Sequence, residues 1–146
     1  MLLNDETPQE SMCNAMLSPS NEKLFLQVAV ALACIVPVTA GLGGMFYGAE
    51  FLGGSTTALD SHFRYLSGLL LGIGLAFLSS IPHIERHGAR FRLLTGLVII
   101  GGLGRLAGIF MTAASDYTML AALAMELCVT PALYLWQRRI ARRFHL

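Results

Sequence analysis

Residues 93–111 of the chain read LLTGLVIIGGLGRLAGIFM, a run in which Arg105 is the single charged side chain. A helix needs about 20 predominantly apolar residues to cross the roughly 30 Å hydrocarbon core of a bilayer, and this run has that length. It lacks the period-two alternation of a half-buried strand. Because backbone groups in lipid must be hydrogen-bonded within their own segment, the run is predicted to be a membrane-spanning helix.

Three further apolar runs, at about 24–46, 63–81 and 118–136, have similar length and composition. The connections between the four runs are short, so neighbouring helices should be antiparallel. The chain has 146 residues, of which 55% are hydrophobic and 13% charged, against about 25% charged in an average soluble domain. The sequence therefore predicts an all-α, integral-membrane, up-down-up-down four-helix bundle over residues 23–137 and excludes disordered, coiled-coil and nucleic-acid-binding classes.

The segments outside this domain are polar. Residues 1–22 hold four acidic residues and two prolines and are predicted to be a disordered tail, and residues 138–146 a basic tail. Asp60 or Ser61 is placed to cap the second helix, and Pro37 and Pro131 to bend the first and fourth. The number of cysteines is odd and no CxxC pair occurs, so Cys34 and Cys128 are interpreted as small buried apolar residues.

The basic residues are distributed unevenly between the two ends of the predicted bundle. One end holds the N-terminal tail, the 82–92 connection and the C-terminal tail, and the other end holds Arg64 as its one basic residue. The first end holds eight basic residues: Lys23, Arg86, Arg90, Arg92, Arg138, Arg139, Arg142 and Arg143. The positive-inside rule predicts that both termini are cytoplasmic.

Two ionisable residues lie deep within the apolar runs, Arg105 in the third and Glu126 in the fourth. At 1.5 Å per residue, Arg105 lies about 10 Å from the end of its helix and Glu126 about 13 Å from the start of the next. Antiparallel neighbours thus bring the two charges to similar depth. Since a charge within a bilayer is costly unless it is paired, an Arg105–Glu126 ion pair is predicted in the outer half of the membrane.

His62 immediately precedes the second apolar run and Arg64 lies at its start, and both are assigned, with Arg105 and Glu126, to a polar ligand site that opens outward. A small-residue face with Gly68 and Gly72 is predicted to dock on a glycine stripe of the third helix, since such residues permit close backbone approach. That stripe consists of Gly101, Gly104 and Gly108. Three interpretations of the pair are left open: a register-fixing ion pair, a pocket for an anionic or polar ligand, and a proton path through Glu126.

The sequence contains none of the Walker A, GxSxG, HExxH or paired CxxC motifs, and no catalytic residue, cofactor or metal is predicted. His83, Glu85 and His87 are close together in the 82–92 connection, but a solvated polar loop accounts for them because a full set of zinc ligands is lacking. Asp60, His62 and Arg64 are interpreted in the same way, as capping and interfacial groups rather than an acid–base set. The protein is therefore expected not to be an enzyme.

The stretch from Asp60 to Trp136 resembles a family of small bacterial four-helix membrane proteins known as domain of unknown function 4345. Three pieces carry this resemblance: HFRYLSGLLLGIG at 62–74, GGLGR at 101–105, and the Glu126-Leu127 dipeptide. The resemblance implies the four-helix architecture and a place in the inner membrane of a bacterial cell, and it points to Arg64, Arg105 and Glu126. It implies no activity.

Two classes of function are compatible with these observations. One is a binding protein whose pocket around Arg64, Arg105 and Glu126 holds a lipid-like or small polar ligand. The other is an accessory subunit that packs through its glycine faces with itself or with a larger membrane complex. The expected surroundings are the lipid bilayer in both cases. A cavity of roughly 300 Å³ or more that reaches Arg105 favours the first class.

Overall fold

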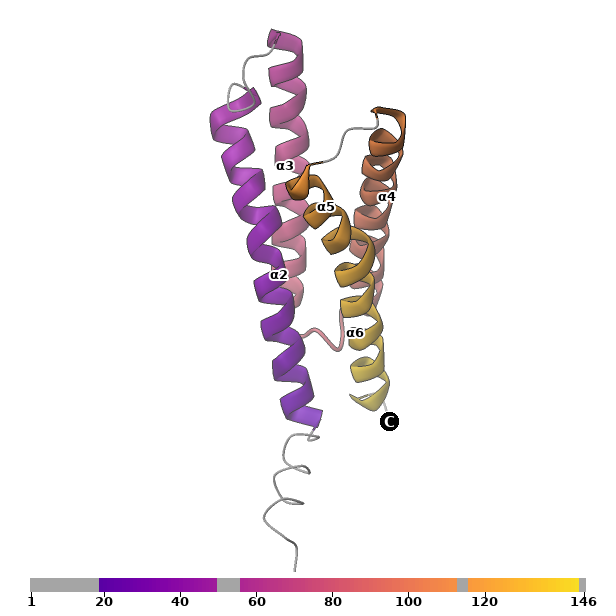
Figure 1. Cartoon of the computed structure of the whole chain (residues 1–146). Helices are drawn as coiled ribbons and strands as arrows, with labels where there is room; N and C mark the ends of the chain where they lie inside the picture. Colours follow the sequence, from indigo (N-terminus) through magenta and orange to yellow (C-terminus); the bar gives the residue numbers. More distant parts are fainter. Residues whose placement is uncertain (1–18, 50–55, 113–115, 145–146) are drawn as a thin grey trace, which may run out of the picture.

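The computed structural model describes residues 19–49, 56–112 and 116–144, and these residues are helical apart from short connections. The helices form four antiparallel rods (Figure 1). The first three are α2 (Pro19–Tyr47), α3 (Thr57–Ser80) and α4 (Gly88–Thr112). The fourth consists of α5 (Tyr117–Ala124), the π-helical turn η2 (Met125–Val129) and α6 (Thr130–Phe144). The described residues include no strand, which confirms the all-α prediction.

Each of the four rods is long and apolar enough to cross a membrane. The corresponding spans are Ser20–Tyr47, Thr57–Leu78, Gly88–Thr112 and Tyr117–Arg143. One end of the bundle, called here the basic end, holds the start of α2, the 81–87 connection and the end of α6 (Figure 1). The opposite end holds the end of α2, the start of α3, the end of α4 and the start of α5.

The helices extend further into polar sequence than hydropathy predicts. The α6 helix continues to Phe144 through residues assigned to a basic tail, because arginine is a good helix former and cations near a helix C-terminus are favourable. The α2 helix starts at Pro19, a residue type favoured at the first helical position. The expected tail covers residues 1–22, of which residues 19–22 belong to this helix and residues 1–18 lie outside the described residues.

The start of α3 differs from the prediction that Asp60 or Ser61 caps it. Thr56 is the N-cap, and its side chain accepts a hydrogen bond from the Leu59 amide at 3.4 Å. Asp60 lies within the first turn, where its carboxylate accepts hydrogen bonds from Arg64 of the same helix and from the Ala49 amide. The cap therefore lies four residues earlier, because a hydroxyl residue in extended conformation is available there.

The α2 and α3 helices pack closely, far more extensively than α3 packs on α4. A Cβ built on Gly41 would lie 2.8 Å from the backbone nitrogen of Leu71 and 2.9 Å from the carbonyl oxygen of Ser67. A Cβ on Gly74 would lie 2.9 Å from Val38. Ser67, Leu71 and Gly74 are spaced as one helical face, so α3 turns this face to α2. Close backbone approach thus occurs within the α2–α3 hairpin.

The docking predicted between the glycine faces of α3 and α4 is not formed. A Cβ built on Gly101, Gly104 or Gly108 meets no atom within 4 Å, and the same holds for Gly72. A Cβ on Gly68 has one neighbour, the Met45 sulfur at 3.6 Å. The prediction was wrong because the face of α3 that packs is the one bearing Ser67 and Gly74, and its partner is α2.

The closely packed core lies toward the basic end. Its buried members come from α2, α3, the 81–87 connection, α4 and α6: Leu26, Val30, Cys34, Phe77, Ile84, Phe91, Leu94 and Ile140. The Phe77 and Phe91 rings meet edge to face, with centroids 4.9 Å apart. This cluster joins the α2–α3 hairpin to the other two rods.

Two glutamine amides hold the connection between α3 and α4 in place. Gln27 of α2 donates to the Ile81 carbonyl, and the fully buried Gln137 of α6 donates to the Ile84 carbonyl, both at 2.8 Å. These carbonyls follow the end of α3, where the helix offers no partner of its own. The connection between α3 and α4 is therefore held by the first helix, α2, and by the last helix, α6.

Ion pairs close the basic end. Lys23 pairs with Glu85 at 2.9 Å, and Arg143 at the end of α6 pairs with Glu22 at the start of α2, at 2.8 Å. The first and last described helices are thus adjacent at this end, as an up-down-up-down topology requires.

Candidate functional site

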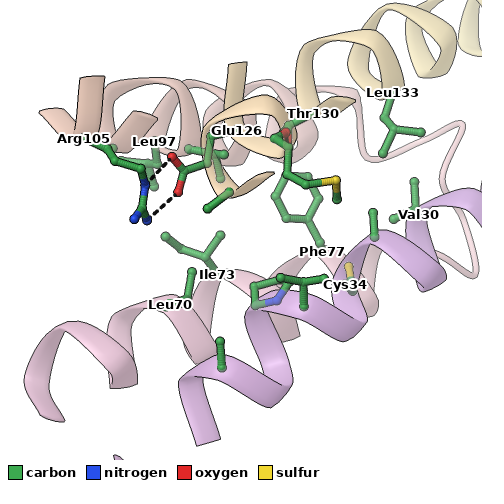
Figure 2. A pocket seen from close by; sticks show the side chains of 18 of the residues that line it. Val30, Cys34, Leu70, Ile73, Phe77, Leu97, Arg105, Glu126, Thr130 and Leu133 are labelled. Carbon is green, nitrogen blue, oxygen red and sulfur yellow. Dashed lines mark hydrogen bonds and ion pairs between the residues drawn. The ribbon is translucent and has the colours of Figure 1, made fainter. Parts of the chain in front are cut away.

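The ion pair predicted between Arg105 and Glu126 is formed. Nε of Arg105 donates to one oxygen of Glu126 at 3.1 Å, and Nη2 donates to the other at 3.0 Å (Figure 2). This side-on, two-bond geometry is the strongest arrangement of a guanidinium with a carboxylate. The Arg105 side chain is 37% exposed and the Glu126 side chain 19%. The pair therefore lies on the wall of an internal space rather than inside packed side chains.

Gly102 allows the fourth rod to approach α4 closely enough for this pairing. A Cβ at Gly102 would lie 3.0 Å from the Cβ of Glu126 and 2.8 Å from a methyl carbon of Leu127. Gly102 is buried, whereas its neighbours Gly101 and Gly104 are exposed. The glycine that matters for the site was therefore adjacent to the predicted stripe and not part of it.

Glu126 lies in the π-helical turn Met125–Val129, which immediately precedes Thr130 and Pro131. The Thr130 amide donates to the Met125 carbonyl five residues back, and the Thr130 hydroxyl donates to the same carbonyl at 2.8 Å. Pro131 has no N–H, and its ring clashes with an α-helical carbonyl four residues earlier, so a wider turn relieves the clash. The local bend expected at Pro131 takes this form, and Figure 1 shows the rod changing direction between α6 and α5. The other predicted bend does not break its helix, since Pro37 lies inside a continuous α2.

A cavity of about 610 Å³ lies between the four rods, and both members of the ion pair line it. At one end it rests on the core residues Val30, Cys34, Phe77 and Phe91. Its walls come from all four rods and are mainly aliphatic and aromatic, including Pro37, Ala40, Leu70, Ile73, Leu97, Val98, Met119, Ala122 and Leu133 (Figure 2). Volumes of roughly 300–1,000 Å³ are typical of ligand pockets.

The polar groups on the cavity wall are few. Among the described residues that line it, Arg105 and Glu126 are the only charged ones, and Thr118 and Thr130 bear the hydroxyls. The Thr118 hydroxyl donates to Asp116 at 3.0 Å, and the Thr130 hydroxyl to Met125. The site is therefore an apolar chamber with one charged pair on its wall, and not the polar pocket that the sequence suggested.

Arg64 does not join this site. It donates to Asp60 at 2.8 Å and to the carbonyls of Met45 and Phe46 at 2.6 and 3.1 Å. Asp60 in turn accepts from the Ala49 amide at 2.7 Å. Arg64 thus satisfies the last carbonyls of α2, which have no partner within the helix. Arg64 therefore does not take part in the predicted site with Arg105 and Glu126, because these carbonyls lie nearer to it.

His62 also lies away from the cavity. Its side chain is exposed, and its ring centroid is 6.5 Å from that of Tyr65. Of the four predicted ligand-binding residues, the structure brings together Arg105 and Glu126 and leaves His62 and Arg64 at the end of the α2–α3 hairpin.

The cluster in the 81–87 connection is held by other interactions. Glu85 binds Lys23, while a ring nitrogen of His87 lies 2.9 Å from the His83 carbonyl. Burial of Glu85 by itself raises the pKa of the carboxyl, but the hydrogen bond and charge of Lys23, with a backbone hydrogen bond, outweigh burial and hold the pKa below its ordinary value. Within the described residues, no three His, Cys, Asp or Glu side chains are placed to hold a metal ion.

The cysteines differ from each other. Cys34 is buried and lines the cavity, as an apolar core residue would. Cys128, also expected to be buried, is exposed. It follows Glu126 by two residues, and in the π-helical turn this spacing points it away from the cavity.

These features define a class: an all-helical protein with four helices suited to span a membrane and an internal cavity that carries an ion pair. A family model described as "Domain of unknown function (DUF4345)" matches residues 25–137, and the chain belongs to this family. The match covers all four rods, including the first helix, which the three motifs did not reach. No curated protein and no solved structure matches the chain significantly.

Proposed function

We propose that the protein is a non-enzymatic, multi-pass membrane protein that holds a lipid-like molecule in the cavity between its helices. The observation that carries this proposal is the chamber of about 610 Å³ whose apolar walls come from all four rods and whose charged groups are Arg105 and Glu126. Apolar lining with a few convergent polar groups is the usual composition of a site for an amphiphilic ligand.

The shape of the bundle supports a ligand that enters from the bilayer. The hairpin of α2 and α3 is closely packed, whereas α3 and α4 contact each other sparsely. Leu70 of α3 and Leu97 of α4 line the cavity and are exposed. Entry between these two rods would give an apolar molecule a lateral path to the chamber without crossing water.

The proposed location is the inner membrane of a bacterial cell, with both termini in the cytoplasm. The basic end of the bundle carries Arg86, Arg90, Arg138, Arg139, Arg142 and Arg143, which the positive-inside rule places in the cytoplasm. The cavity and the Arg105–Glu126 pair would then lie in the outer half. Membrane-impermeant labelling of single cysteines introduced at Thr56 and at Arg142 tests this: Thr56 should react in intact spheroplasts, and Arg142 only after lysis.

Ligand binding is tested by filling the cavity. Gly101 lines it, and a Cβ at Gly101 meets nothing within 4 Å, so Gly101→Phe places a ring in the chamber without a backbone clash. Gly104 is also exposed and free of neighbours but does not line the cavity, and Gly104→Phe is the matched control. Native mass spectrometry of protein purified from its own membranes should show a bound lipid in the wild type and Gly104→Phe, and much less in Gly101→Phe. Equal lipid in all three proteins would refute the cavity as its site.

A second candidate function is that of an accessory subunit, in which this face packs with a second copy or a membrane complex. It is favoured by the exposed Gly104 and Gly108, which no described residue approaches. The same pair of variants separates the two functions. An accessory role predicts that Gly104→Phe dissociates an assembly while bound lipid is unaffected, whereas a binding role predicts loss of lipid from Gly101→Phe.

A further inference from the structure

The charges on the cavity wall cancel. Glu126 contributes one negative charge and Arg105 one positive charge, and no other charged residue in the described part of the chain lines the chamber. The remaining basic side chains lie elsewhere. Arg64 is bound to Asp60 and to α2 carbonyls, and the arginines of α6 lie at the basic end. A ligand head group in the chamber therefore meets a neutral pair and no free cation.

Hydrogen-bond donors nevertheless remain available. A guanidinium has five N–H groups, and Glu126 engages one on Nε and one on Nη2 of Arg105. No other described residue accepts from Arg105, which leaves Nη1 and the second hydrogen of Nη2 free for a ligand. Figure 2 shows the guanidinium at the cavity, facing the region where Leu70 and Ile73 of α3 lie. A bound oxygen atom can therefore be reached without breaking the pair.

The balance of charge on the cavity wall decides which kind of ligand oxygen can bind Arg105. An anionic head group would bring a second negative charge to a guanidinium that already holds Glu126, in surroundings of low dielectric constant where like charges repel strongly. A carbonyl or hydroxyl oxygen accepts a charge-assisted hydrogen bond from Nη1 and adds no charge. The apolar walls accommodate its hydrocarbon part.

We infer that the ligand of this cavity is a neutral lipid whose head group accepts hydrogen bonds through a carbonyl or hydroxyl oxygen. The inference rests on the proposed function and narrows it. Glu126 is then a specificity-determining residue, because its carboxylate neutralises Arg105 and so excludes fatty acids and other anionic lipids.

The test compares two probes that differ in the head group: a long-chain monoacylglycerol and the fatty acid of the same chain length. Delipidated protein in neutral detergent is offered both in equal amount at neutral pH, and bound species are counted by native mass spectrometry. Wild type should take up the monoacylglycerol in preference by about tenfold, a difference that corresponds to roughly 1.4 kcal/mol. Glu126→Gln, which keeps the side-chain size but frees the guanidinium charge, should reverse this preference.

The outcomes separate this inference from the proposed function. A wild-type preference for the fatty acid, or no preference, overturns the inference while leaving a lipid site in place, and so does a folded Glu126→Gln protein with unchanged preference. Uptake of neither probe, or uptake that Gly101→Phe leaves unaffected, counts against the cavity site itself. The comparison of the two probes on wild type needs no variant, so it tests the inference even if Glu126→Gln does not fold.

Discussion

Glu126 binds the Nε–Nη2 edge of Arg105 through two hydrogen bonds, although the residues lie on different rods and are 21 positions apart. Removing one partner leaves the other charge without compensation. Arg105→Leu should therefore lower stability by about 2 kcal/mol, less than the roughly 3–5 kcal/mol of fully buried pairs because the guanidinium is partly exposed. The double variant Arg105→Leu with Glu126→Leu should recover much of this loss. Melting temperature in detergent measures both.

One outcome would contradict the prediction about the ion pair. If the double variant is as unstable as Arg105→Leu or less stable, the stranded carboxylate does not account for the loss. The single variant Glu126→Leu provides the complementary arm, since it strands Arg105, whose longer side chain can reach more polar surroundings. It should be destabilised less than Arg105→Leu.

A second prediction concerns the contact between α2 and α3. In Gly41→Ala the new methyl group meets backbone atoms of Leu71 and Ser67, which cannot move aside as a flexible side chain can. We expect a loss of about 1–3 kcal/mol, the usual cost of overpacking. Gly43→Ala, two residues along the same helix, meets nothing within 4 Å and should be neutral or slightly stabilising. Thermal unfolding of the two variants side by side gives the answer, and similar melting temperatures would show that the helices do not approach as described.

The third prediction concerns Gln137, which is fully buried and donates to the Ile84 carbonyl. Gln137→Met has similar size but removes this donor, so the Ile84 carbonyl is left buried without its partner, which typically costs about 1–3 kcal/mol. Thermal unfolding in detergent should therefore give a lower melting temperature for Gln137→Met than for wild type.

The matched control is Leu135→Met, two residues earlier on the same helix, where the side chain is exposed and the melting temperature should change little. Equal melting temperatures for Gln137→Met and wild type would show that the amide does not hold the connection from a buried position.

The four rods and the ion pair were predictable because they depend on local and additive properties. Apolar length identifies a span, and a rise of 1.5 Å per residue places Arg105 and Glu126 at one depth. Which faces of the helices meet depends instead on the whole arrangement. Glycines are frequent on several faces of α3 and α4, and composition alone does not distinguish Gly102, which packs, from Gly101 and Gly104, which do not.

A pocket at Arg105 and Glu126 was among the hypotheses, but its apolar lining and its extent could not be predicted, because an empty space leaves no pattern of its own in one sequence. Its lining residues are ordinary apolar residues that would equally form a packed core. Arg64 was misplaced for a related reason: an arginine near a helix end satisfies backbone carbonyls of a neighbouring helix as readily as it binds a ligand. One local signal was available for the site, the Thr130-Pro131 dipeptide, whose effect on the helix produces the π-helical turn that holds Glu126.

The final prediction concerns the pH dependence of the basic end, where Glu85 binds Lys23. Because the pKa of Glu85 is below its ordinary value of 4.5, the unfolded chain binds this proton more readily than the folded protein does. The stability that the pair contributes is therefore fully present above the ordinary pKa and is lost as the pH falls through the lower, folded value. Glu85→Gln should remove this part of the acid sensitivity. The melting temperatures of wild type and Glu85→Gln, measured between about pH 3 and pH 6, should converge toward the acid end. Wild type loses there the stabilisation by the Glu85 carboxylate, which the variant lacks at every pH. Parallel curves over that range would mean that Lys23 does not stabilise the Glu85 carboxylate in the folded protein.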